Sequence, residues 1–179
     1  MLTSLDSLLT ATSLDLLTID DSLPTETGQR LLRFPLGFQD SALLPLEQIA
    51  EILRVNLAEI LPVPEMPDCV LGICNWRGEM LWLIDLNHLV GFMPLSLTAS
   101  SPIAMVVQVN DQPIGLVVQQ VNDIELHELE KLQPAAAGLF PPKLLPFVLG
   151  TLPGGSGTVL DVTAIALSPL WQIHRGGVS

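Results

Sequence analysis

The sequence predicts a mostly β fold made of two small barrels with about five strands in each. Proline and glycine residues interrupt the body of the chain, residues 28–179, at short intervals. The segments between them are rich in leucine and β-branched residues, which is typical of short strands rather than long helices. A second observation is an internal repeat, because the two halves of this body carry the same order of residue types.

The repeat emerges when the sequence is moved 72 residues along itself. Residues 31–62 then lie on residues 103–134 without a gap, with Gln48 on Gln120 and Pro62 on Pro134. Looser matches at offsets of 78 and 76 follow in the same order. Neither half, at about 70 residues, buries much core alone, so we expect the halves to pack on each other.

The strands follow the same order in both halves. A first strand is predicted at 31–37 and again at 103–109, each leading into a turn with Asp or Asn. A second strand forms a hairpin with the first and is expected to run on through 49–53, or through 121–124 in the second half. Further short strands follow a connection that contains proline.

Each half is expected to close with a strand and a short helix. The last strands end at Asp85 and Asp161, which occupy equivalent places in the repeat. An aspartate at the start of a helix accepts a hydrogen bond from a free backbone N–H. We therefore predict capped helices at 86–90 and 162–167, and not a catalytic carboxylate pair.

The segment Asn75-Trp76-Arg77-Gly78 predicts a tight hairpin turn between two apolar strands. Gly78 accepts a positive φ, and Asn tolerates one. Two interpretations of Arg77 remain open. It is one of only seven basic residues, and at a rigid tip it suits an acidic or carbonyl-rich partner. It equally suits an internal salt bridge or a cation–π stack on Trp76.

Composition excludes several functions. The 179 residues carry a net charge of −12, and only 15% of them are charged. An acidic chain without a Lys/Arg cluster has no electrostatic footprint for nucleic acid, and anionic membrane surfaces repel it. Because 49% of the residues are hydrophobic, we expect a protein partner to cover part of the apolar surface.

The chain divides into a leader and a body. Residues 1–27 hold five acidic and no basic residues, so we expect a flexible acidic leader. No window has about 20 clean apolar residues, and the N-terminus lacks a positive region, so we expect neither membrane insertion nor a signal peptide. The body, 28–179, is expected to be one cytoplasmic domain. Its subdomains are expected at about 38–100 and at about 103–155, the latter completed by crossing terminal strands.

These residues match a family. The run VLGICNWRGEMLWLIDL at 70–86 resembles the V-x-G-x-x-N-x-R-G-x-x-x-x-x-(I/V)-D-L pattern of the CheW family of chemotaxis adaptors. Segment 48–52 is similar to the family's V-x-E-I, and 64–67 to its P-x-x-P approach. Segment 115–118 resembles the start of its G-x-x-V-D-x-V strand. The resemblance covers about residues 29–170.

The chain departs from the family at three places. Trp76 stands where the family usually has Leu or Val, Gln119 stands where it has Asp, and Trp82 replaces a common Pro. These departures suggest a divergent system, one that steers pili or responds to light (phototaxis).

The resemblance implies two intertwined five-stranded SH3-like barrels with a third core between them and a few short helices. It implies a non-catalytic adaptor that couples chemoreceptor tips to a histidine kinase of the CheA type. The kinase's regulatory domain would dock on the first barrel, and the receptor's cytoplasmic tip would lie in the groove between the barrels. The family's protein-binding positions fall at the turn and on the strand before it: Ile49, Glu51, Asn75, Trp76, Arg77 and Gly78.

Other functions have weaker support. The three histidines have no metal-ligand spacing, no G-x-S-x-G elbow is present, and the glycine-rich segment 152–157 is not followed by Lys. We expect no enzyme activity, no cofactor and no metal. The alternative is a duplicated β-barrel that binds a small apolar ligand. A ligand barrel would have a closed apolar cavity, whereas an adaptor would have exposed apolar patches.

Overall fold

The computed structural model describes residues 28–37, 40–98, 101–135 and 141–168; the predicted leader, 1–27, lies outside them. The first half forms five strands: β1 (Gln29–Leu36), β2 (Asp40–Pro45), β3 (Ile49–Arg54), β4 (Val70–Trp76) and β5 (Glu79–Asp85). The second half forms five more: β6 (Ile103–Val109), β7 (Gln112–Val118), β8 (Ile124–His127), β9 (Val148–Thr151) and β10 (Thr158–Leu160).

Short helices connect and end these strands. The helix α2 (Leu86–Leu89) follows β5, and α3 (Val162–Ala166) follows β10. Single 3-10 turns lie between strands: η2 (Leu46–Gln48), η3 (Leu57–Glu59), η4 (Leu129–Lys131), η5 (Leu145–Phe147) and η6 (Pro153–Gly155). Among the residues that the structure describes, no helix is long and apolar enough to cross a membrane.

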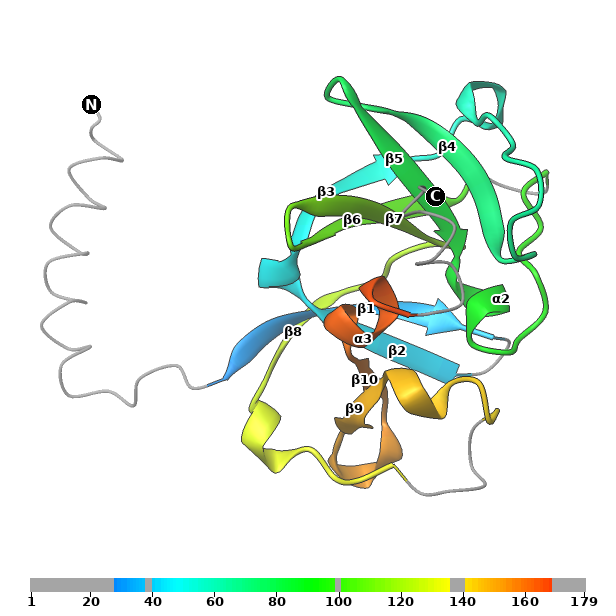
Figure 1. The fold of residues 1–179 in the computed structure, drawn as a ribbon. Helices are drawn as coiled ribbons and strands as arrows, with labels where there is room; N and C mark the ends of the chain where they lie inside the picture. Colours follow the sequence, from blue (N-terminus) through cyan, green and yellow to red (C-terminus); the bar gives the residue numbers. More distant parts are fainter. Residues whose placement is uncertain (1–27, 38–39, 99–100, 136–140, 169–179) are drawn as a thin grey trace, which may run out of the picture.

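The ten described strands form two five-stranded sheets, as the mostly β prediction requires. Sheet A has the order β8-β1-β2-β10-β9, and sheet B has the order β3-β6-β7-β5-β4. Replacing each strand by its partner in the repeat converts one order into the other, so the internal repeat is also a repeat of topology. Figure 1 shows the strands of sheet B above those of sheet A.

Each sheet takes strands from both halves of the chain. Sheet A combines β1 and β2 with the last three strands, and sheet B combines β6 and β7 with β3, β4 and β5. This exchange involves whole hairpins, so the sheets do not follow the expected limits of 38–100 and 103–155. The reason is that β-sheet partners are chosen by burial of apolar faces, which also pairs segments far apart in sequence.

The predicted continuation of the first hairpin through 49–53 is wrong. The chain leaves sheet A at Pro45, makes the single turn η2, and enters sheet B as β3, which pairs with β6. In the second half β8 likewise leaves β7 and pairs with β1 in sheet A. A proline followed by a 3-10 turn redirects the strand, since proline has no N–H for a central ladder.

The strand registers correct the ungapped repeat by one residue. Leu44 on β2 and Leu116 on β7 are 72 residues apart, but their partners Leu32 and Met105 are 73 apart. The extra residue lies in the β1–β2 turn, which has three residues between paired ends where the β6–β7 turn has two. A side chain shifted by one position in a strand faces the opposite side.

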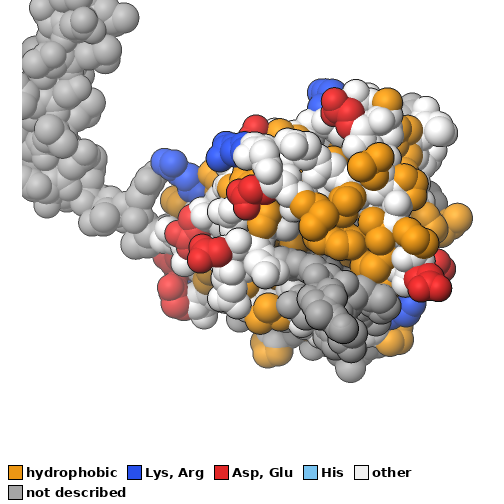
Figure 2. All heavy atoms as spheres, turned by 45° about the horizontal axis from the view of Figure 1, so that its top comes forward, with side chains coloured by type: hydrophobic (Ala, Val, Ile, Leu, Met, Phe, Trp, Pro, Cys, Tyr) orange, Lys and Arg blue, Asp and Glu red, His pale blue; other side chains and the backbone are white. Residues whose placement is uncertain are grey.

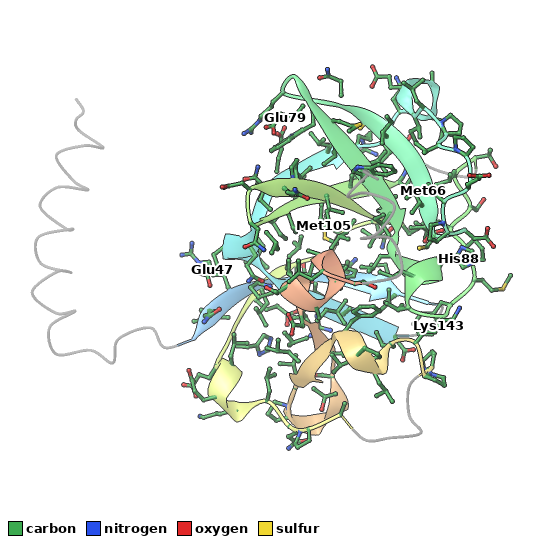
Figure 3. The ribbon with its side chains drawn as sticks, viewed as in Figure 1. Glu47, Met66, Glu79, His88, Met105 and Lys143 are labelled. Carbon is green, nitrogen blue, oxygen red and sulfur yellow. The ribbon has the colours of Figure 1, made fainter. Side chains whose placement is uncertain are left out.

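Hydrophobic side chains of the described residues pack into three cores. The largest lies between the sheets and includes Phe34 and Leu44 of sheet A with Met105 and Leu116 of sheet B; Figure 3 shows Met105 between the two sets of strands. Two smaller cores lie on the other side of each sheet: Leu81, Leu83 and Val106 in sheet B, and Leu31, Leu43 and Val159 in sheet A. The halves therefore pack on each other as expected.

Candidate functional site

The predicted hairpin turn joins β4 to β5. Trp76 pairs with Glu79, and the two residues between them, Arg77 and Gly78, have φ angles of 53° and 80°. Two positive φ angles define the type I′ turn that matches the twist of a hairpin. The Asn75 Oδ1 atom accepts a hydrogen bond from the Gly78 N–H at 3.2 Å. Figure 3 shows Glu79 at this outer tip.

Glu51 holds this turn against β3. Its Oε1 atom accepts a hydrogen bond from the Trp76 indole Nε1 at 2.9 Å. The same oxygen lies 2.9 Å from Arg77 Nη2. The Arg77 guanidinium also stacks on the Trp76 ring, 4.8 Å from its centroid. Strands β3 and β4 are the two edges of sheet B, so these contacts tie one edge to the other.

Arg77 and Trp76 differ in their exposure to solvent. Trp76 is 5% exposed and belongs to the core of sheet B. The Arg77 side chain is 62% exposed, although it makes both internal contacts that the sequence allowed. An ion pair this exposed contributes little to stability. The guanidinium is held in one place and still presents most of its surface to solvent.

Five of the six predicted site residues lie together, and the sixth does not. Glu51, Asn75, Trp76, Arg77 and Gly78 meet at the end of the hairpin. Ile49 packs instead against the core between the sheets. A register shift in the pairing with β6 sets Ile49 opposite Val107, in the core between the sheets, and Glu51 opposite Val106, in the core of sheet B. Such a bulge is not visible in the sequence.

A pocket of about 350 Å³ opens between β3, η3 and β4. Its apolar walls include Leu53, Ile60 and Leu83, and its rim includes Glu51 and Arg77. Cys74 also lines it, and burial raises the pKa of the Cys74 thiol, so the group stays protonated at neutral pH. Four of the five clustered residues, Glu51, Asn75, Trp76 and Arg77, therefore line a recess at the open side of sheet B.

Sequence reasoning missed an apolar surface next to the cluster. Leu61 and Met80 are 62% and 57% exposed, and they line a shallow hollow together with Ile73. Leu61 and Ile73 form an isolated β-bridge, and the matching bridge in the other half joins Gln133 to Thr151. Residues at the same place are thus apolar in sheet B and polar in sheet A.

This difference points to binding, because both sheets have the same fold to maintain. A signal for it was present in the repeat, where Leu61 lies on Gln133 at the offset of 72. Figure 2 tips the sheet B end toward the reader and shows hydrophobic side chains gathered on that face, with charged groups beside them. Exposed apolar clusters with a polar rim are typical of protein interfaces.

The other half has a different polar cluster. Arg33 donates from Nε and Nη2 to the two carboxylate oxygens of Glu125, at 2.5 and 2.9 Å, and from Nη1 to the Ser156 carbonyl oxygen at 2.8 Å. The His127 Nε2 atom lies 2.8 Å from Glu125 Oε1. Hydrogen bonds from Arg33 lower the pKa of Glu125 to about 2. The cluster ties β1 and β8 to the β9–β10 loop.

A profile of known proteins decides the family. The family model described as "CheW-like domain" matches residues 30–168. The chain belongs to the CheW-like domain family. The match covers both sheets and both short helices, and the resemblance in the N-x-R-G hairpin is confirmed.

Individual proteins that are similar to this chain support the same family. Chemotaxis protein CheW of Rhizobium meliloti is 31% identical over 110 residues, which are 62% of this chain and 68% of that protein. Probable chemotaxis protein CheW of Rhizobium etli is 39% identical over 72 residues, 40% of this chain and 46% of that one. The scaffolding protein TtCheW of Thermoanaerobacter tengcongensis has the same fold, with a TM-score of 0.62 and 20% identity over 75% of this chain and 88% of that chain. This CheW-like protein is thus a chemotaxis adaptor.

Proposed function

We propose that this CheW-like adaptor couples the cytoplasmic tip of a chemoreceptor to the regulatory domain of a CheA-type histidine kinase, without catalysis of its own. Family membership supports the pair of partners. The single observation that carries the choice of surface is the apolar face of sheet B. Leu61 and Ile73 stand there in place of the polar Gln133 and Thr151 of sheet A, and the exposed Met80 lies beside them.

The kinase regulatory domain would pack on a surface that we call the β4–β5 face: the hollow formed by Leu61, Ile73 and Met80, together with the exposed guanidinium of Arg77 at the rim of the adjoining pocket. Apolar side chains supply area that is removed from water, at about 25 cal/mol per Å². Arg77 supplies a fixed positive group for a carboxylate or carbonyl oxygen of the partner. The receptor tip would use the groove between the sheets, so the two partners bind at different places.

The test compares the same substitution at equivalent positions in the two halves of the repeat. Leu61→Glu and Gln133→Glu each add one negative charge at an exposed, equivalent bridge position. We expect Leu61→Glu to weaken binding of the kinase regulatory domain at least 10-fold and Gln133→Glu to leave it unchanged, in a calorimetric titration. Both variants should keep their melting temperature, because exposed substitutions change stability by about 0.5 kcal/mol or less.

Arg77→Ala tests the polar part of the same face. Loss of a desolvated charged contact costs about 2–5 kcal/mol of binding, roughly 30-fold to several thousand-fold in affinity. Arg77→Lys should restore only part of it, since an ammonium lacks the planar fork. Equal kinase affinities for Leu61→Glu and Gln133→Glu, or weakened binding of a receptor tip hairpin by Leu61→Glu alone, would contradict the proposed surface.

A further inference from the structure

The pocket between β3, η3 and β4, which we call the β3–β4 recess, lies where the other sheet has larger side chains. With the one-residue correction to the repeat, Ala104 of β6 corresponds to Leu31 of β1. In the same way Val106 corresponds to Arg33. Leu31 is fully buried, and Arg33 reaches across to β8 and to the β9–β10 loop. The recess, of about 350 Å³, is therefore space that opens where sheet B has the shorter residues.

The inner wall of the recess is also less polar than the same place in sheet A. Glu125, which binds Arg33 there, is paired with Leu31. The residue paired in the same way with Ala104 is Leu53, so an apolar side chain stands where sheet A has a carboxylate. Both Leu53 and Ala104 line the recess. Its interior thus suits an apolar group that is removed from water on binding.

Polar groups of both signs lie around the recess. Arg54 and Glu59 line it and are exposed, and neither makes an ion pair or a side-chain hydrogen bond with another residue that the structure describes. The amide oxygens of Asn56 and Asn75 accept backbone N–H groups of their own turns, which leaves their NH2 groups as donors. The rim therefore offers a cation and two amide donors for a carboxylate, and a carboxylate for an ammonium group.

We propose that the β3–β4 recess binds a small zwitterion with an apolar side chain, that is, an apolar α-amino acid. The apolar side chain lies against Leu53 and Ala104. The ligand's carboxylate is bound by Arg54 and the asparagine amides, and its ammonium group by Glu59. The volume is near the lower end of small-molecule sites, which span about 300–1,000 Å³, and this favours a ligand of single amino-acid size.

Such a ligand would also act on kinase binding. Arg77 lines the same recess and belongs to the β4–β5 face, so a bound amino acid would compete with the kinase regulatory domain for this part of the surface. The competition rests on the proposed function, whereas the ligand site does not. The experiments below therefore use the full chain without the kinase, and their outcome is independent of where the kinase binds.

Three related compounds test the class of ligand. An NMR titration with L-phenylalanine follows the indole N–H of Trp76, which lines the recess. We expect a dissociation constant on the order of 1 mM, within reach of a ligand of this size. Phenylpropanoate lacks the ammonium group and phenethylamine lacks the carboxylate, so each should bind about 3- to 5-fold more weakly, as for an ion pair at an exposed rim. Equal binding of the three compounds, or no saturable shift with phenylalanine, would overturn the proposal.

Two variants connect each charged group of the rim to one end of the ligand. Glu59→Gln should bind phenylalanine no better than phenylpropanoate, and should still prefer phenylalanine to phenethylamine. Arg54→Gln should lose the preference over phenethylamine and keep the preference over phenylpropanoate. Both residues are exposed, so both variants should fold. Unchanged preferences in both variants would contradict the proposed orientation of the ligand and, with it, the site.

Filling the recess tests its location. Ala104→Leu introduces the residue that β1 has at the equivalent position, and it should abolish the binding of phenylalanine. Ala50→Leu adds the same group at an exposed position of β3 outside the recess, and it should leave the binding unchanged. Cys74→Met narrows the recess from β4 and replaces Ala104→Leu if that variant does not fold. Phenylalanine binding that survives in the folded filling variants would overturn the proposal.

Discussion

At the scale of single residues, polar side-chain contacts join strands across the open side of each barrel. In sheet B, Glu51 on the edge strand β3 accepts from Trp76 at the end of the opposite edge strand β4. In sheet A, Arg33 on β1 bonds to Glu125 on the edge strand β8 and to Ser156 in the loop between β9 and β10. The contact in sheet B joins a carboxylate to a neutral indole, whereas Arg33 in sheet A bonds both to a carboxylate and to a neutral carbonyl group.

The ion pair between Arg33 and Glu125 in sheet A predicts that the stability of the protein depends on pH. The pKa of Glu125 is about 2, below its ordinary value of 4.5, because Arg33 and His127 bond to the carboxylate. A folded pKa below the unfolded one stabilises the protein above about pH 4.5, and this stabilisation is lost as the pH falls through about 2. At pH 7, Glu125→Gln should cost about 1.5–3 kcal/mol, the range for hydrogen bonds to charged groups.

Urea unfolding of the unmodified chain and Glu125→Gln between pH 7 and pH 2 checks this. The difference in unfolding free energy should shrink as the pH falls from about 5 toward 2, while the effects of groups that do not contact Glu125 cancel between the two proteins. Gln133→Glu serves as a control at an exposed site of the same sheet. A difference that does not depend on pH would show that the Glu125 carboxylate is not stabilised in its charged form.

Sequence alone predicted part of the site at this scale. The N-x-R-G turn placed Asn75, Arg77 and Gly78 correctly, because turn conformation is a local property. The internal salt bridge and the cation–π stack of Arg77 are confirmed. The interpretation that Arg77 binds a partner stays a prediction, for a side chain that is 62% exposed. The role of Arg33 was missed, because its partners Glu125 and Ser156 lie 92 and 123 residues away in the sequence.

At the scale of elements, the β4–β5 turn allows backbone strain to be tested at a position where an added side chain would touch no other residue. Gly78 has a φ of 80°, and a Cβ built there would meet nothing within 4 Å. Gly78→Ala should therefore cost about 1–2 kcal/mol, purely from the left-handed conformation. Chemical denaturation measures the loss.

Two further variants separate conformation from contact. Gly78→Asn should cost less than Gly78→Ala, since asparagine visits this region more readily. Gly157→Ala, on the β9–β10 loop, should be costly for another reason, because its Cβ would come within 2.6 Å of Leu43. If Asn and Ala at position 78 are equally destabilising, the strain explanation is wrong.

Elements fixed by local chemistry were predicted well, and elements fixed by distant contacts were not. Asp85 and Asp161 cap the helices as expected, and Asn110 and Asp111 form the expected turn with positive φ. The path of β3 was not predicted, because the sequence of Ile49–Arg54 suits a strand in either sheet. Only the partner, β6, decides which sheet it joins.

At the scale of the whole molecule, the leader remains a prediction. Residues 1–27 lie outside the part of the family model that matches, which starts at residue 30. We expect deletion of 1–27 to shift the melting temperature by only a few degrees, on the order of 1 kcal/mol for a chain of this size. Scanning calorimetry measures the shift. Loss of cooperative unfolding after deletion would show that the leader supplies part of a core.

The exchange of hairpins between the sheets sets an order for folding during synthesis. Every strand of sheet B, from β3 to β7, has left the ribosome soon after Val118 is made. In sheet A, β1 pairs with β2 and with β8, but the other edge of β2 has no partner until β10, which ends at Leu160, has emerged. Contacts between such distant segments form slowly. The nascent chain therefore exposes one open edge of β2 after sheet B is complete. In this interval the chain is most prone to aggregate and to bind chaperones.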